Sequence, residues 1–157
     1  MDLLSVALSG LVGAVLGSVA TLLEERNRRH RDEMGAARAL YFEMVGNAAF
    51  LKRVVERSPL TDLRRATWDA TQSRVATLLA PNDLKAVAEA YGMLPVCQAN
   101  IDAARARGHL VSADDLNVWA GGYNSFLDGV IVLRRTAWSK KDQEDLAKPR
   151  DESPVPA

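Results

Sequence analysis

The feature that most constrains this chain is an uncharged run of 21 residues, from Leu3 to Leu23, which ends at a cluster of arginines. At about 1.5 Å of rise per residue, a helix over this run is roughly 31 Å long, which matches the hydrocarbon core of a bilayer. A helix buried in a soluble protein normally keeps a polar face, and this run has no charge on any face. The run therefore predicts a transmembrane anchor over residues 1–23 and makes the lipid bilayer the first expected partner.

The basic residues that follow the run set its expected orientation. They are Arg26, Arg28, Arg29 and Arg31. A secretion signal, the main alternative, has its basic region before the apolar core, so the observed order favours an anchor. Flanks rich in Lys and Arg stay in the cytoplasm. We therefore expect a single-pass protein of the inner (cytoplasmic) membrane, with its N-terminus outside and its C-terminal domain in the cytoplasm.

Small residues recur at every fourth position of the same run. They are Ser5, Ser9, Gly13, Gly17 and Thr21. This spacing keeps small side chains near one helix face, and a GxxxG pair lets two membrane helices approach closely. Glycine and alanine are also common in membrane helices that make no such contact. The pattern predicts a helix–helix interface in the membrane, either with a second copy of the chain or with another membrane protein.

Beyond the run, apolar residues recur in alternating steps of three and four, a heptad-like pattern typical of helices that pack together. No proline interrupts the chain before Ser58-Pro59, so we expect one helix to continue through a charged stalk, residues 24–33. Turn signals then divide residues 34–138 into four helices, expected at 34–57, 62–80, 83–107 and 113–138. Short loops favour antiparallel neighbours. The sequence thus predicts an all-α protein: the anchor, a cytoplasmic antiparallel four-helix bundle over 34–138, and a disordered tail over 139–157.

Three local signals refine this bundle. Pro95 falls inside the third helix and predicts a kink, or a split after Leu94. The segment from Ser112 to Asp115 predicts an N-terminal cap with an acid in the first turn. Gly121-Gly122 lies in the middle of the fourth helix, where close packing against a bulky neighbour is a simpler explanation than the approach of a ligand.

An even number of antiparallel helices returns the chain to the membrane side. The residues expected there are Arg134, Arg135, Trp138, Lys140 and Lys141. Tryptophan and basic side chains suit the headgroup layer, where each nearby Lys or Arg contributes about 1 kcal/mol. A helix C-terminus also favours positive charge because of its dipole, so both interpretations stay open.

The sequence shows no catalytic or metal-binding pattern. His30 and His109 have no partner at metal-ligand spacing, and Cys97 has no basic residue within four positions. Phosphate-loop, dinucleotide and nucleophile-elbow motifs are absent. Glu43 and Asn47 lie one turn apart beside the first apolar seam, where they either fix helix register or simply face solvent. We therefore expect no cofactor, no metal and no enzyme activity.

The charge balance gives no support for binding to nucleic acid. Lys plus Arg and Asp plus Glu both number 20, so the formal net charge is zero. Without a catalytic set, the predicted helix-pairing face favours a membrane-anchored interaction or scaffold protein, and the layout is similar to that of many bacterial membrane proteins. Two alternatives remain: a membrane-bound sensor that binds a small molecule or lipid in its bundle core, and an enzyme whose active site is assembled from distant residues.

Overall fold

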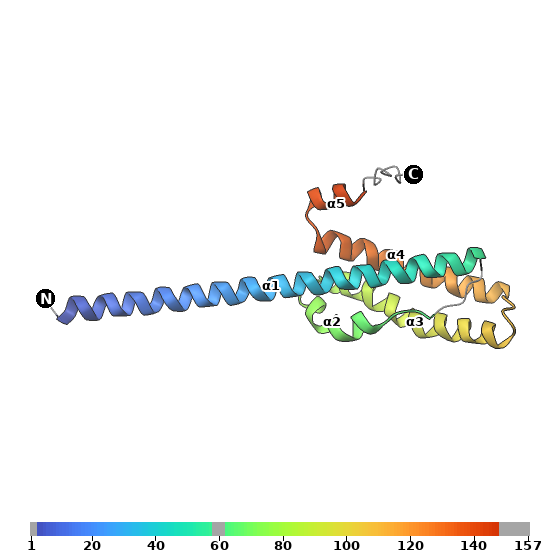
Figure 1. Ribbon diagram of the computed structural model, residues 1–157, viewed down its shortest axis with the longest axis horizontal. Coiled ribbons are helices and arrows are strands. Elements are labelled where there is room, and N and C mark those ends of the chain that lie inside the picture. The colour runs from blue at the N-terminus through green and yellow to red at the C-terminus, as the bar shows by residue number, and fades with distance from the viewer. Residues whose placement is uncertain (1–2, 58–61, 148–157) are drawn as a thin grey trace, which may run out of the picture.

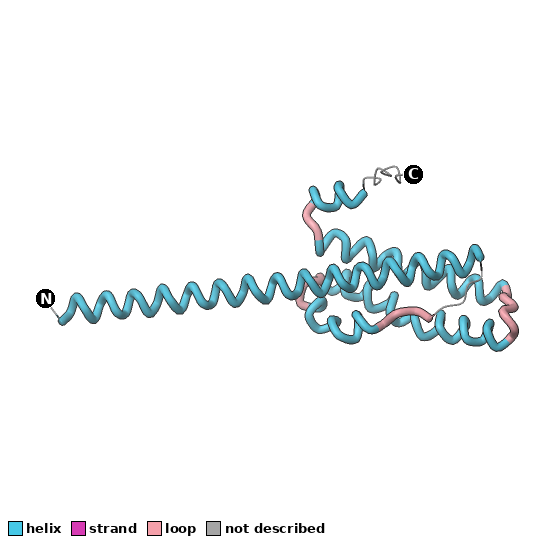
Figure 2. Tube along the Cα trace, in the orientation of Figure 1, coloured by secondary structure: helices cyan, strands magenta, loops and turns pink. Residues whose placement is uncertain are grey.

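The computed structural model describes residues 3–57 and 62–147, and these residues form helices joined by short loops, without a strand (Figure 2). The helices are α1 (Leu3–Arg57), α2 (Ala66–Ala76), α3 (Pro81–Ala106), α4 (Ala113–Ala137) and α5 (Lys140–Ala147). Figure 1 shows that α1 projects far beyond the bundle that its second half forms with α2, α3 and α4. The predictions of an all-helical protein and of a helical bundle are confirmed.

The longest helix, α1, joins the predicted anchor, stalk and first bundle helix into one helix of 55 residues. Within the bundle, its inward side is buried at Ala37, Leu40, Met44 and Leu51. Residues 16–32 of the same helix are exposed throughout, because no other helix lies beside them (Figure 1). One continuous helix therefore carries both the packed and the unpacked part of the molecule.

The bundle has two layers, one formed by α1 and α4 and the other by α2 and α3. In the first layer the helices are antiparallel: the Arg38 Nε, near the start of the packed part of α1, donates to the carbonyl of Ala137 at the end of α4, at 3.1 Å. Between the layers, α2 packs on α1 and α3 packs on α4. This up-and-down order agrees with the short loops that the sequence predicts.

Glycine brings α4 close to its neighbours at the centre of the bundle. A Cβ at Gly122 would collide with the Cys97 sulfur and come within 3.3 Å of Leu51 Cδ1. At Gly121 a Cβ would meet nothing within 4 Å. The close-packing explanation therefore holds for Gly122, and Gly121 faces open space.

The second and third helices differ from the predicted ones, and α2 ends at Ala76 instead of 80. Helix α2 begins at Ala66 instead of 62, because side chains of α1 and α3 hold residues 62–65 in an irregular conformation, as described below. Helix α3 runs through Pro95 without interruption, so the predicted split after Leu94 is wrong. Pro95 is exposed, which keeps its ring out of the packed core.

The beginning of the predicted disordered tail is also helical. Ser139 caps α5: its hydroxyl donates to the Asp142 carboxylate at 2.7 Å and accepts from the Asp142 amide at 3.2 Å. No proline follows until Pro149, so nothing stops a short helix after this cap. Residues 148–157 lie outside the described residues.

The predicted cap of α4 is confirmed as a full capping box. The Ser112 hydroxyl accepts a hydrogen bond from the Asp115 amide, and the Asp115 carboxylate accepts one from the Ser112 amide at 2.8 Å. Arg107 adds an ion pair to the same carboxylate at 2.5 Å. These interactions fix the turn between α3 and α4.

The transmembrane prediction gains no support from the described residues, among which no helix is both long enough and apolar enough to cross a bilayer. The side chains of residues 1–15 lie outside the described part of the chain, and with them the predicted interface positions Ser5, Ser9 and Gly13.

Candidate functional site

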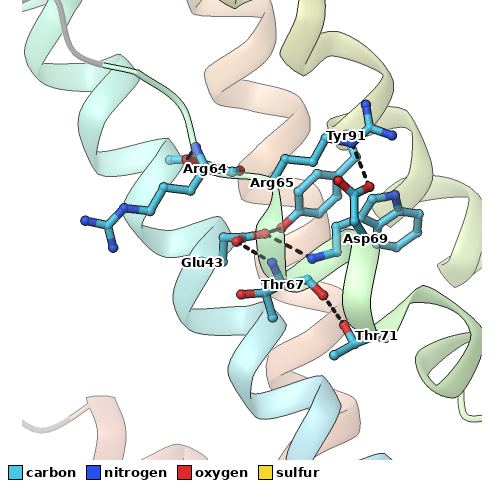
Figure 3. Close-up of polar contacts among 9 residues, drawn as sticks. Glu43, Arg64, Arg65, Thr67, Asp69, Thr71 and Tyr91 are labelled. Carbon is cyan, nitrogen blue, oxygen red and sulfur yellow. Dashed lines mark hydrogen bonds and ion pairs between the residues drawn. The ribbon is translucent and has the colours of Figure 1, made fainter.

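A group of buried and half-buried polar side chains holds α2, and the segment before it, against α1 and α3. Its members are Glu43, Asn47 and Gln98, which we call the polar clamp. Glu43 is only 8% exposed. Its Oε2 accepts from the Thr67 amide at 2.8 Å, and its Oε1 accepts from the Trp68 amide at 3.2 Å and from the Tyr91 hydroxyl at 2.7 Å (Figure 3).

Glu43 acts as the N-terminal cap of α2, although it belongs to another helix. The first amides of a helix have no partner within the helix, and the helix dipole makes that end positive. The residue at the N-cap position itself, Arg65, makes no capping bond with its side chain. A carboxylate from α1 therefore satisfies two amides that α2 cannot satisfy alone.

Asn47 and Gln98 hold the segment that precedes α2. Asn47 donates through Nδ2 to the Arg64 carbonyl at 2.7 Å and accepts through Oδ1 from the Arg64 amide at 2.8 Å. Gln98 accepts from the Leu63 amide at 2.9 Å and donates to Asp62 at 3.1 Å. The polar clamp thus forms hydrogen bonds with the Leu63 amide and with the amide and carbonyl of Arg64. These backbone groups are then not available for helical hydrogen bonds, which is why residues 62–65 stay non-helical.

Solvent exposure, the simpler of the two sequence explanations for Glu43 and Asn47, is therefore wrong. Both side chains are buried, and both carboxylate oxygens of Glu43 and both the nitrogen and the oxygen of the Asn47 side-chain amide have intramolecular partners. Burial, followed by the hydrogen bond to Glu43, raises the pKa of Tyr91 far above its usual range. The Tyr91 hydroxyl therefore stays a donor, and the polar clamp fixes the position of α2 on α1.

Histidine and cysteine form no reactive site in the described part of the chain. His30 lies on the exposed projecting part of α1 and His109 lies in the turn after α3. Cys97 is buried, and burial raises the pKa of its thiol to about 11, so its thiolate is scarce near neutral pH. No group of three His, Cys, Asp or Glu residues there is placed to hold a metal ion.

The basic end of α4 is engaged within the protein. Arg134 donates to the Gln143 carbonyl at 2.6 Å, and Arg135 pairs with Asp83. Trp138 packs against Tyr41 with ring centroids 4.8 Å apart, and the Arg38 guanidinium lies over the Trp138 ring at 5.6 Å. Lys140 and Lys141 are exposed.

The distance between the C-terminal end of α4 and a bilayer decides whether the predicted contact with lipid headgroups can form. Arg38 lies level with Ala137 and follows Leu23 by 15 residues, or about 23 Å of helix. Headgroup layers are only about 5–8 Å deep on each side. Contact of Trp138, Lys140 and Lys141 with lipid stays a prediction, and it requires a strongly tilted α1.

The predicted interface and topology residues that are described lie on the projecting part of α1, and all are exposed. The Thr21 hydroxyl donates to the Gly17 carbonyl at 2.9 Å, and a Cβ at Gly17 would meet nothing within 4 Å. Arg29 pairs with Glu25 at 2.5 Å, and Arg31 donates to the Asn27 carbonyl at 3.3 Å. Arg26 and Arg28 share this exposed surface.

Two hollows lie on the described part of the surface. One, of about 670 Å³, runs along α1 from Leu22 to Glu33, and its described lining residues all belong to this helix. Another, of about 370 Å³, lies between α1 and the segment before α2; its basic side chains are Arg53 and Arg64. The buried indole Nε1 of Trp119 has no hydrogen-bond partner among the described residues, but it lines neither hollow.

Comparison of the chain with known protein families, with curated proteins and with solved structures finds no match.

Proposed function

We propose that this protein is a membrane-anchored scaffold, in which the N-terminal part of α1 lies in the bilayer and the bundle is an interaction module on the cytoplasmic side. The observation that carries the proposal is the exposed apolar surface of α1 at residues 16–23. Leu16 is 64% exposed and Leu22 is 67% exposed, and Val19 and Leu23 are exposed beside them. Contiguous apolar surface of this kind marks a place where a membrane or another protein binds.

The bilayer is the occupant that fits the whole uncharged run. Of the 21 residues from Leu3 to Leu23, only residues 16–23 have described side chains, so the finding that no described helix is apolar enough leaves the first part of the run untested. The arginines that follow support a cytoplasmic bundle. Their placement on an exposed, unpacked helix agrees with a stalk that leads from membrane to bundle.

A scaffold role is supported by what the bundle does with its polar groups. The buried carboxylates of Glu43 and Asp115 each cap a helix, and the Cys97 thiol is packed in the core. Metal-assisted catalysis needs ligands grouped around the ion, and among the described residues no three His, Cys, Asp or Glu side chains are placed to hold one. A rigid helical surface held at a membrane suits binding to other proteins.

Membrane fractionation of the full-length protein tests the anchor. We expect the protein in the membrane fraction and resistant to extraction at alkaline pH. The variant Gly13→Arg with Leu16→Arg should move to the soluble fraction, because each arginine near the bilayer centre costs about 2.5–3.5 kcal/mol. The matched control, Asn27→Arg with His30→Arg, adds the same charge to the stalk and should leave the protein in the membrane. Release of the unaltered protein at alkaline pH would overturn the proposal.

Thiol labelling tests the orientation in the same membranes. The variant Asp2→Cys should react with a membrane-impermeant maleimide in intact cells, and Lys141→Cys should react only after lysis. Native Cys97 is buried, so it contributes little background. The reverse labelling pattern would place the bundle outside and contradict the proposed cytoplasmic scaffold.

A further inference from the structure

The larger hollow, on the projecting part of α1, joins an apolar end to a basic end (Figure 1). Its first residues, Leu22 and Leu23, are 67% and 55% exposed. Farther along the helix it is lined by Arg26, Arg29 and His30. Leu22, Arg26 and His30 follow one another at intervals of four residues, about 6 Å of helix, so they lie near one side of α1. The hollow therefore presents apolar surface and, one turn later, a cation.

The cations of this stretch are only partly neutralised within the protein. Arg29 pairs with Glu25 at 2.5 Å. The side chains of Arg26 and Arg28 form no ion pair and no hydrogen bond with the described part of the chain. Residues 24–31 hold four arginines and two glutamates, a net charge of +2, and the next acids follow only at positions 32 and 33. Free positive charge therefore lies directly beyond the two leucines.

The arginine side chains lean toward the N-terminus of α1, as side chains do in every α-helix. Arg29 reaches back one turn to Glu25, and Arg31 donates to the carbonyl of Asn27, also one turn back, at 3.3 Å. Arg26 and Arg28 follow Leu23 by three and five residues, or about 4.5 and 7.5 Å of helix. With Leu23 at the edge of the hydrocarbon, their guanidinium groups lie within a headgroup layer about 5–8 Å deep.

We infer that this hollow binds an anionic phospholipid of the cytoplasmic leaflet, with the acyl chain against Leu22 and Leu23 and the phosphate at Arg26. The inference rests on the proposed function, because only an anchored α1 places the hollow at the level of the headgroups. A guanidinium group can bind two phosphate oxygens at once. The net charge of +2 favours lipids with a net negative charge over zwitterionic lipids, which carry the same phosphate.

A lipid suits this hollow better than a helix of another protein does. Its volume, about 670 Å³, lies within the range of roughly 300–1,000 Å³ that is usual for sites of small molecules. Between Leu23 and Met34 the sequence has no apolar residue. A partner helix would therefore find no apolar seam to pack against along this part of α1.

Native mass spectrometry of the full-length protein tests the lipid site. The protein is released from nanodiscs that contain equal amounts of phosphatidylglycerol and phosphatidylcholine with the same acyl chains. We expect phosphatidylglycerol to be retained in at least fivefold excess, because one Lys or Arg near an anionic surface strengthens binding by about that factor. Arg26→Gln with Arg28→Gln reduces the net charge of residues 24–31 to zero, so this variant should retain the two lipids equally.

The matched control removes two arginines of the bundle that are also exposed. Arg53→Gln with Arg64→Gln takes away the same charge, and should keep the excess of phosphatidylglycerol. Both variants should remain in the membrane fraction, since Arg29 and Arg31 still mark the cytoplasmic flank. Equal retention of the two lipids by the unaltered protein, or an equal loss of the excess in both variants, would overturn the inference.

Two further measurements separate this site from a site for free anions and from the anchor. An excess of glycerol 3-phosphate, which has the phosphate but no acyl chain, should not displace the lipid; displacement would show a site for free phosphate esters and contradict the inference. A protein that resists alkaline extraction but retains both lipids equally refutes the lipid site alone. A protein that is released at alkaline pH refutes the proposed anchor, and the lipid site with it.

Discussion

Replacing Glu43 by alanine should destabilise the bundle by about 3 kcal/mol. The substitution removes the acceptor of the Thr67 amide, the Trp68 amide and the Tyr91 hydroxyl. Loss of a helix cap costs about 1 kcal/mol, and a buried donor left without a partner costs about 1–3 kcal/mol. Trp68 and Tyr91 are buried, so the Trp68 amide and the Tyr91 hydroxyl each lose about 1 kcal/mol, the lower end of that range. Thr67 is within reach of water, so the loss of its bond is counted only as the loss of the helix cap.

The conservative variant separates the lost hydrogen bonds from the lost volume. Glu43→Gln keeps the size of the side chain and one acceptor oxygen, but its amide group turns a donor toward other donors. We expect a loss of about 1–2 kcal/mol. The matched control is Glu89→Ala, which removes an exposed glutamate of α3 whose ion pair with Lys85 spans 3.6 Å. Such exposed pairs contribute at most about 1 kcal/mol.

Urea unfolding of the full-length protein in mild detergent, followed by tryptophan fluorescence, measures these losses. Trp68 stacks on Tyr91 with ring centroids 4.8 Å apart, so the signal reports directly on the site. In thermal scans, 3 kcal/mol corresponds to roughly 10 °C for a chain of this size. Hydrogen exchange of the Thr67 and Trp68 amides should also accelerate. If Glu43→Ala and Glu89→Ala lost equal stability, the capping role assigned to Glu43 would be refuted.

Three further predictions concern single side chains. Gly122→Ala should destabilise by about 1–3 kcal/mol through its collision with Cys97, whereas the neighbouring Gly121→Ala should stabilise by about 0.5–1 kcal/mol, and equal urea midpoints would contradict the packing. The hydrogen bond from the Ser112 backbone, aided by the Ser112 hydroxyl and Arg107, lowers the pKa of Asp115. A lowered carboxyl pKa contributes stability that is present above about pH 4 and lost as the pH falls through the folded value. Asp115→Asn should therefore lower stability at pH 7 and flatten its decline below pH 4, as urea titrations at several pH values would show. Cys97, whose thiol pKa burial raises to about 11, should react with a disulfide reagent at pH 8 only as fast as the bundle opens, so labelling that is rapid without urea would contradict its burial.

The periodicity of the sequence predicted part of the core, although it did not single out Leu40 and Val54, which are fully buried. The seams predicted for the bundle contribute Met44 and Leu51 from α1 and Trp119 and Phe126 from α4, all fully buried. The capping box at Ser112 was equally visible, because a cap is a local pattern of four residues. Periodicity works here because burial of one helix face dominates the free energy of a bundle.

The polar clamp could not be predicted in the same way. Glu43 and Asn47 lie one turn apart on α1, but their backbone partners, three amides and a carbonyl, follow 17–25 residues later. The Tyr91 hydroxyl, which donates to Glu43, follows 48 residues later. A pattern of side-chain spacing in the sequence cannot reveal hydrogen bonds between segments that are far apart in the chain. The late start of α2 has the same cause, because residues 62–65 give up helical hydrogen bonds for bonds to the clamp.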